Sequence, residues 1–170
     1  MQRTFSVMIV SILLGLLIGN IRAAENSAEP VFAMRPIGRI EKDGERTWIV
    51  LDKKYQPGLL GLDGFSHLQV IWWFDKNDTP EKRAILRVHP RGDARNPLTG
   101  VFATRSPFRP NLIALSLCKI VAVKENVVEI EQIDAFEGTP VLDLKPYAPG
   151  QDSATDVKVP AWAGPPGEKR

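Results

Sequence analysis

The chain has 170 residues, 44% of them hydrophobic and 25% charged, which is the composition of an ordinary globular protein with one domain. Its 22 basic and 20 acidic residues give a formal net charge of +2, so a uniformly basic nucleic-acid binder is excluded. Cys118 is the single cysteine, which excludes an intramolecular disulfide and a thiolate metal cluster.

The first 24 residues have the pattern of a secretory leader. Arg3 precedes an apolar run over residues 5–18, and the stretch ends in alanines at Ala24. This pattern is typical of a signal peptide or an N-terminal anchor and is short for a membrane span. We therefore expect export to the periplasm or attachment to the membrane, with a connector over residues 25–35. The alternative is a cytoplasmic protein translated from Met34.

The first half of the remaining chain predicts strands separated by turns. Residues 47–51 (TWIVL) favour a strand, and residues 58–65 (GLLGLDGF) favour a short helical turn. Residues 67–74 alternate as a strand with Leu68 and Trp72 on one side and His67 and Trp73 on the other. Both sides are largely apolar, so we expect this strand to be buried in a barrel or against a partner subunit.

The second half predicts further strands over residues 84–88, 101–104, 112–123, 126–133 and 140–145. No amphipathic helix longer than two turns is evident, so the pattern favours an all-β barrel or sandwich. Cys118 lies in an apolar run and is expected to be an inert core residue. Residues 150–170 are rich in proline, glycine and charge, and we expect a mobile, disordered tail.

Charge is distributed unevenly along the chain. Residues 82–109 hold seven basic side chains against one acid, and residues 125–143 hold six acids and no base. This pattern predicts either one basic patch for an anion or two blocks that neutralise each other.

The stretch from Val88 to Asn111 is the strongest candidate for a site. It places four arginines among Pro, Gly, Asn and Asp residues, which favour turns over a long helix. Guanidinium groups bind carboxylates and phosphates through paired N–H donors, so the stretch indicates an anion site. The alternative is a solvated loop with surface ion pairs. The four arginines are Arg91, Arg95, Arg105 and Arg109.

Three motifs resemble the TsaA-like, or TrmO, family of S-adenosylmethionine-dependent tRNA methyltransferases in sequence and order. In chain order they are GLDGFSHL, VHPRGD with GVFATRSPFRPN, and DAFEGTPVLDLKPY. The resemblance covers residues 36–149. It implies a small TsaA-like β-barrel with short helical turns that pairs as a homodimer and methylates the exocyclic amine of a threonylcarbamoylated adenine in tRNA. S-adenosyl-L-methionine is the cofactor that it implies.

The resemblance also implies where the cofactor and the substrate bind. Matching the family's motifs position by position gives a cofactor-binding set of Arg105, Leu115, Glu131, Gln132, Ile133, Asp134, Lys76 and Asn77. The substrate-binding set is Arg91, Arg95, Arg109 and Asn111. Acids suit the amino or ribose groups of the cofactor, an arginine suits its carboxylate and an apolar wall suits its adenine.

Two departures from the family pattern keep other functions open. The chain runs directly from residues 37–40 into EKDGERTWIVLD, so a family segment that contributes to the cofactor pocket is absent, and Asp75 stands where the family commonly has His. The alternatives are an exported, non-catalytic binding module for another anion or protein, and methylation of a small molecule. We expect no metal site, and no Ser66–His67 hydrolase because neighbours on a strand point to opposite faces.

Overall fold

The structure, a computed structural model, describes residues 30–164. The chain divides into two units, residues 1–33 and 34–170, and the strands described here belong to the second. The predicted leader over residues 1–24 and the end of the predicted tail, residues 165–170, lie outside the described part. Within the described residues, no helix is both long enough and apolar enough to cross a membrane.

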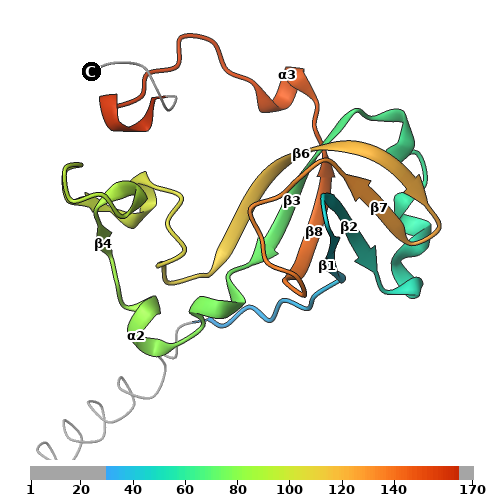
Figure 1. Ribbon diagram of the computed structural model, residues 1–170, viewed down its shortest axis with the longest axis horizontal. Coiled ribbons are helices and arrows are strands. Elements are labelled where there is room, and N and C mark those ends of the chain that lie inside the picture. The colour runs from blue at the N-terminus through green and yellow to red at the C-terminus, as the bar shows by residue number, and fades with distance from the viewer. Residues whose placement is uncertain (1–29, 165–170) are drawn as a thin grey trace, which may run out of the picture. The chain divides into compact units, whose positions relative to one another are not determined.

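Six antiparallel strands close into a barrel in the order β1-β2-β7-β6-β3-β8. Figure 1 shows these strands, with β6 as the long arrow that curves past β3 and β7. The strands are β1 (Gly38–Asp43), β2 (Arg46–Leu51), β3 (His67–Trp73), β6 (Ile113–Lys124), β7 (Val127–Ile130) and β8 (Pro140–Pro146). The expectation of a mostly β protein built on a small barrel is therefore confirmed.

The barrel interior is filled by alternate residues of each strand. On β3, Leu68, Val70 and Trp72 are buried, and the residues between them are half-buried. The same alternation places Ile40 of β1 and Ile49 of β2 in the core, both fully buried. Burying side chains of this size stabilises a fold by roughly 1.5–3 kcal/mol each, so this interior is the main support of the barrel.

The barrel closes through a short contact between β1 and β8, in which Gly38 pairs with Val141 and Arg39 with Pro140. Gly38 also faces β2, and a Cβ atom built on it would lie 2.3 Å from the carbonyl oxygen of Val50. That separation is too short for any side chain, so glycine is required where the chain enters the barrel.

Two short strands, β4 (Arg87–Val88) and β5 (Thr99–Gly100), pair in a separate antiparallel ribbon. Two one-turn α-helices, α2 (Pro80–Arg83) and α3 (Pro149–Asp152), precede the ribbon and follow β8. Thr79 caps α2 by accepting a hydrogen bond from the backbone N–H of Lys82, and Pro80 starts the helix. The 3₁₀ turns are Lys53–Leu59, Leu62–Gly64, Asp75–Asn77, Pro90–Gly92, Val101–Ala103 and Ala161–Ala163.

Several predicted boundaries are wrong. Residues 101–104 form a 3₁₀ turn and its cap, not a strand. The short β5 ends at Gly100, and the Thr104 hydroxyl donates a hydrogen bond to the Val101 carbonyl, which closes the turn. The strand expected over residues 84–88 shortens to Arg87–Val88, because α2 and its cap occupy residues up to Ala84. The strand expected over residues 126–133 ends at Ile130, and β1 was not predicted.

Candidate functional site

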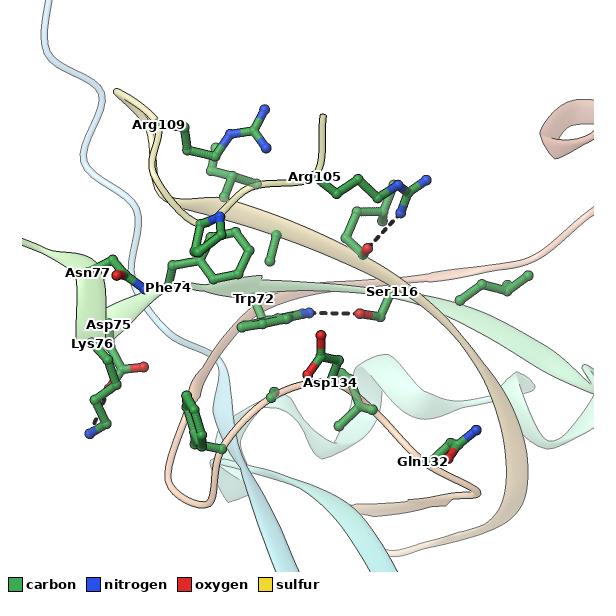
Figure 2. Close-up of a pocket in the computed structure, with 18 of the residues that line it drawn as sticks. Trp72, Phe74, Asp75, Lys76, Asn77, Arg105, Arg109, Ser116, Gln132 and Asp134 are labelled. Atoms are coloured by element: carbon green, nitrogen blue, oxygen red, sulfur yellow. Dashed lines mark hydrogen bonds and ion pairs between the residues drawn. The ribbon is translucent and has the colours of Figure 1, made fainter. Parts of the chain in front are cut away.

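A cavity of about 1090 Å³ lies where four segments of the chain meet. These are the outer face of β6, the turn that follows β3, the loop that follows β7, and the segment from Val88 to Asn111 before β6, called the arginine-rich segment below. Figure 2 shows Asp134 below the hydrogen bond between Trp72 and Ser116, with Arg105 and Arg109 above it. Side chains of opposite charge therefore face the cavity from two sides.

Strand β6 contributes an apolar wall. Its alternation buries Ala114 and Cys118 and leaves Ile113, Leu115 and Leu117 outside, 38%, 43% and 55% exposed. The three outer residues line the cavity. Exposed aliphatic side chains in a row are unfavourable in water, so this wall suits a planar apolar group such as a purine ring.

The loop after β7 presents polar groups because its apolar residues are anchored in the core. Ile133 and Ala135 are buried, so Gln132, Asp134 and Phe136 between and beside them face outward and line the cavity. The ammonium of Lys42 donates to the carbonyl oxygen of Ile133 at 3.1 Å, which ties the loop to β1. Phe136 is 69% exposed, so its ring is available to a ligand in the cavity.

The arginine-rich segment is held by short side-chain hydrogen bonds to its own backbone. The Thr104 hydroxyl donates to the Val101 carbonyl at 2.9 Å and accepts from the Ser106 N–H at 3.2 Å. Arg105 Nη1 donates to the carbonyl oxygen of Leu115 at 3.0 Å. A guanidinium has five N–H donors, so this single contact orients Arg105 and leaves donors for a ligand.

Arg83 joins the turn after β3 to the end of the arginine-rich segment. Its Nε donates to Asp78 Oδ1 at 2.8 Å and its Nη1 to the carbonyl oxygen of Pro110 at 2.7 Å. Its guanidinium also lies over the ring of Trp73, whose Nε1 donates to Asp78 Oδ2 at 3.1 Å. Hydrogen bonds from Arg83 and Trp73 lower the pKa of Asp78, so this carboxylate is charged at neutral pH.

The structure brings most of the predicted cofactor set together. Seven of its eight residues line the cavity, and the exception is Glu131, whose carboxylate pairs with Lys119 at 2.6 Å on the outer surface. Their role as cofactor ligands stays a prediction. The seven are Lys76, Asn77, Arg105, Leu115, Gln132, Ile133 and Asp134.

The predicted substrate set is dispersed. Arg109 lines the first cavity, and Arg91 lines a second cavity of about 1150 Å³. Arg95 forms an ion pair with Asp93, in which its Nη2 donates to Asp93 Oδ2 at 2.7 Å. Asn111 is exposed and lines neither cavity. Arg91 and Arg109 thus line different cavities, and the role of the four residues as substrate ligands stays a prediction.

Sequence reasoning did not single out several lining residues. Trp72 donates from Nε1 to the Ser116 hydroxyl at 3.0 Å, and both line the cavity. Phe136 could have been found from the alternation of apolar and polar residues after β7. Lys42 could not, because β1 was not predicted and the contact spans 91 residues of sequence.

The prediction that Ser66 and His67 point apart is wrong. Ser66 precedes β3, so strand alternation does not apply to it, and its hydroxyl lies 2.9 Å from His67 Nδ1. Within residues 30–164 no group of three or more His, Cys, Asp or Glu residues could hold a metal ion. Cys118 is buried as predicted, and this burial raises the pKa of its thiol to about 11.

Comparisons with known proteins agree with this architecture. The family model described as the tRNA-methyltransferase O N-terminal domain matches residues 32–153. The chain is 44% identical over 118 residues to a Methanocaldococcus jannaschii protein named "Probable S-adenosyl-L-methionine-binding protein", covering 69% of this chain and 94% of that protein. It is 41% identical over 105 residues to the human tRNA (adenine(37)-N6)-methyltransferase, covering 62% of this chain and 23% of that protein.

A crystal structure of TrmO from Pseudomonas aeruginosa is similar in fold, with a TM-score of 0.66 and 26% sequence identity. The match covers 84% of this chain and 66% of the solved one. The chain thus spans nearly all of the archaeal relative, slightly under two thirds of the solved structure and about a quarter of the human relative.

Proposed function

Because the chain belongs to the family of the tRNA-methyltransferase O N-terminal domain, we propose that it binds S-adenosylmethionine in the first cavity and methylates an amine of a nucleic-acid base. The observation that carries the proposal is the lining of that cavity, which combines a guanidinium, a carboxylate and an apolar wall. A volume of about 1090 Å³ is at the upper end of the range for small-molecule sites, so the cofactor would fit with room for part of an acceptor.

The lining residues fit the three chemical parts of the cofactor. Arg105 offers paired donors for the carboxylate of its amino-acid part, and Asp134 offers an acceptor for the ammonium or the ribose hydroxyls. Leu115 and its neighbours on β6 would cover the adenine ring. When bound, the cofactor supplies a methyl group carried on a positively charged sulfur.

The protein's main contribution to catalysis in this proposal is positioning. The hydrogen bond of Arg105 fixes the arginine-rich segment against β6, that of Thr104 shapes the turn before it, and Arg83 fixes the far end of the segment. Holding two reactants in line can supply a large part of a rate enhancement. The acceptor amine must lose a proton, and we assign the uptake of that proton to Asp134, whose exposed carboxylate lines the cavity.

We propose the exocyclic amine of a tRNA adenine as the acceptor, in line with the printed name of the human relative. The test is transfer of a tritium-labelled methyl group from S-adenosylmethionine to tRNA, followed by nucleoside analysis. We expect label in a modified adenosine, and Asp134→Asn should lose most of it. Label in small molecules alone would point to the small-molecule alternative, and no label in any fraction would contradict the proposal.

We also propose that the protein forms a homodimer, as its resemblance implies. The support is the part of β6 beyond the cavity, where Val121 is 56% exposed and lines neither cavity. Two copies could cover this face and bury apolar area that a monomer leaves in water. Light scattering coupled to size exclusion tests this, and a mass of one chain at micromolar concentration would contradict it.

The cellular location decides whether tRNA can be the acceptor. The leader predicted from the sequence favours export, and an exported protein would meet neither tRNA nor the cofactor, so export and tRNA methylation are competing proposals. Intact mass after cell fractionation separates the two cases. A cytosolic species beginning at Met34 supports tRNA methylation, whereas an envelope species beginning near Glu25 excludes tRNA and favours the non-catalytic binding module.

A further inference from the structure

A second cavity adjoins the first, and the proposed cofactor site does not include it. The second cavity, of about 1150 Å³, shares four lining residues with the first: Thr104, Arg105, Pro107 and Asp134. Molecules bound in the two cavities would therefore meet along this shared wall. Asp134 is the carboxylate among the four, so it can face both ligands.

The rest of the second cavity combines aromatic rings with a cation. Phe102 is 77% exposed, and Phe108 and Trp162 are half-buried. Arg91 supplies a guanidinium at the same cavity. Proteins bind unpaired nucleotides in this way, by stacking bases on aromatic rings and holding phosphates with arginine.

The turn that carries Arg91 is built at an energetic cost. Arg91 and Gly92 both have left-handed backbone conformations, with φ of 61° and 67°, and the first is unfavourable for a residue with a side chain. Buried Asn96 holds the turn: its side-chain amide donates to the Pro90 carbonyl at 2.8 Å, and its backbone carbonyl oxygen lies 2.7 Å from His89 Nδ1. A strained arginine kept in place by a buried amide indicates a functional position.

The C-terminal segment completes this cavity. Arg91 Nη2 donates to the carbonyl oxygen of Gly164 at 2.9 Å, which joins the basic turn to the end of the described chain. Val159, Pro160, Trp162 and Ala163 line the cavity. A bond from Ala163 N–H to the Pro160 carbonyl, 2.9 Å long, forms the turn that carries Trp162. The segment expected to be a plain tail thus supplies an aromatic wall.

We propose that the second cavity is the acceptor site and holds an RNA nucleotide. Its base stacks on Phe102 and Trp162, a phosphate binds Arg91, and the amine to be methylated points to the shared wall at Asp134. This inference rests on the function proposed above, because the shared wall matters only if the first cavity holds the methyl donor.

The test measures RNA binding and cofactor binding separately on the full chain. The probe is a fluorescein-labelled RNA hairpin with an adenosine in its loop, followed by anisotropy, and calorimetry gives the cofactor affinity. Trp162→Ala should weaken RNA binding about five- to a hundredfold, as expected for the loss of one stacking partner. Arg91→Ala should weaken it and also lower the slope of log affinity against log salt by about one.

Matched controls separate the site from general effects. Val157→Ala changes an exposed residue of the same segment outside the cavity, and Arg39→Ala removes an exposed arginine from β1. Both should bind RNA within about twofold of the wild type. Trp162→Phe keeps a stacking face and should recover most of the affinity lost in Trp162→Ala.

The outcomes distinguish this inference from the proposed function. RNA affinity that is unchanged in Trp162→Ala and Arg91→Ala, or lost equally in the controls, overturns the inference and leaves cofactor binding to be judged by calorimetry. Wild-type protein that binds the cofactor but no RNA at low salt also overturns it. Wild-type protein that binds no cofactor overturns the proposed function, and the inference falls with it.

Discussion

Arg105→Ala is the variant that tests the cofactor site most sharply. In the structure one N–H of Arg105 is used by the Leu115 carbonyl at 3.0 Å, and the side chain is otherwise exposed beside the first cavity. Losing a hydrogen bond between charged groups costs about 1.5–3 kcal/mol. A difference of 1.4 kcal/mol is tenfold in affinity, so S-adenosylmethionine should bind roughly ten- to a hundredfold more weakly.

Calorimetric titration of the cofactor into each variant provides the measurement. Arg105→Lys keeps the positive charge but not the paired N–H donors, so its affinity should lie between those of the wild type and Arg105→Ala. Arg39→Ala, which removes an exposed arginine from β1 outside both cavities, is the matched control and should bind as the wild type does. Equal affinity in Arg105→Ala and the wild type would refute the placement of the carboxylate at Arg105.

Three further predictions concern the fold. Gly38→Ala places a Cβ atom against the Val50 carbonyl where β1 meets β8, so the free energy of unfolding measured in urea should fall by about 1–3 kcal/mol. An unchanged midpoint of unfolding would contradict this. Burial raises the pKa of the Cys118 thiol to about 11, so iodoacetamide at pH 8 should modify it only in urea, and rapid labelling of native protein would argue against the burial. The pKa of Asp78 is lowered, so its contribution to the free energy of unfolding is full above about pH 4 and is lost as the pH falls further. Asp78→Asn should therefore make the free energy of unfolding less dependent on pH below about pH 4. An unchanged pH dependence would count against the ion pair with Arg83 as a source of stability.

Strands with long apolar sequences were predictable, and those with few apolar residues were not. Residues 67–74 and 112–123 match β3 and β6 within a residue because both are apolar runs free of Gly and Pro. β1 reads GRIEKD and buries one residue, Ile40, so its sequence carries little strand signal. Its pairing with β2 and β8 comes from the closure of the barrel, which no local pattern encodes.

Part of the candidate site was also predictable from the sequence, and part of it was not. Seven of the eight residues that the resemblance assigned to the cofactor lie around one cavity, although only Arg105 and Asp134 belong to the motifs that carry the resemblance. Glu131 lies outside the lining of that cavity, and its carboxylate pairs with Lys119. The second cavity was not foreseen, because it depends on a contact between Arg91 and Gly164, 73 residues apart, in a segment whose composition favours disorder.

The central claim is that the first cavity binds S-adenosylmethionine, and calorimetric titration of the cofactor into the wild-type chain tests it most directly. The account predicts a saturable heat with one site per chain, reduced in Arg105→Ala and retained in Arg39→Ala. No heat of binding at cofactor concentrations up to about 1 mM, which corresponds to roughly 4 kcal/mol of binding free energy, would contradict it.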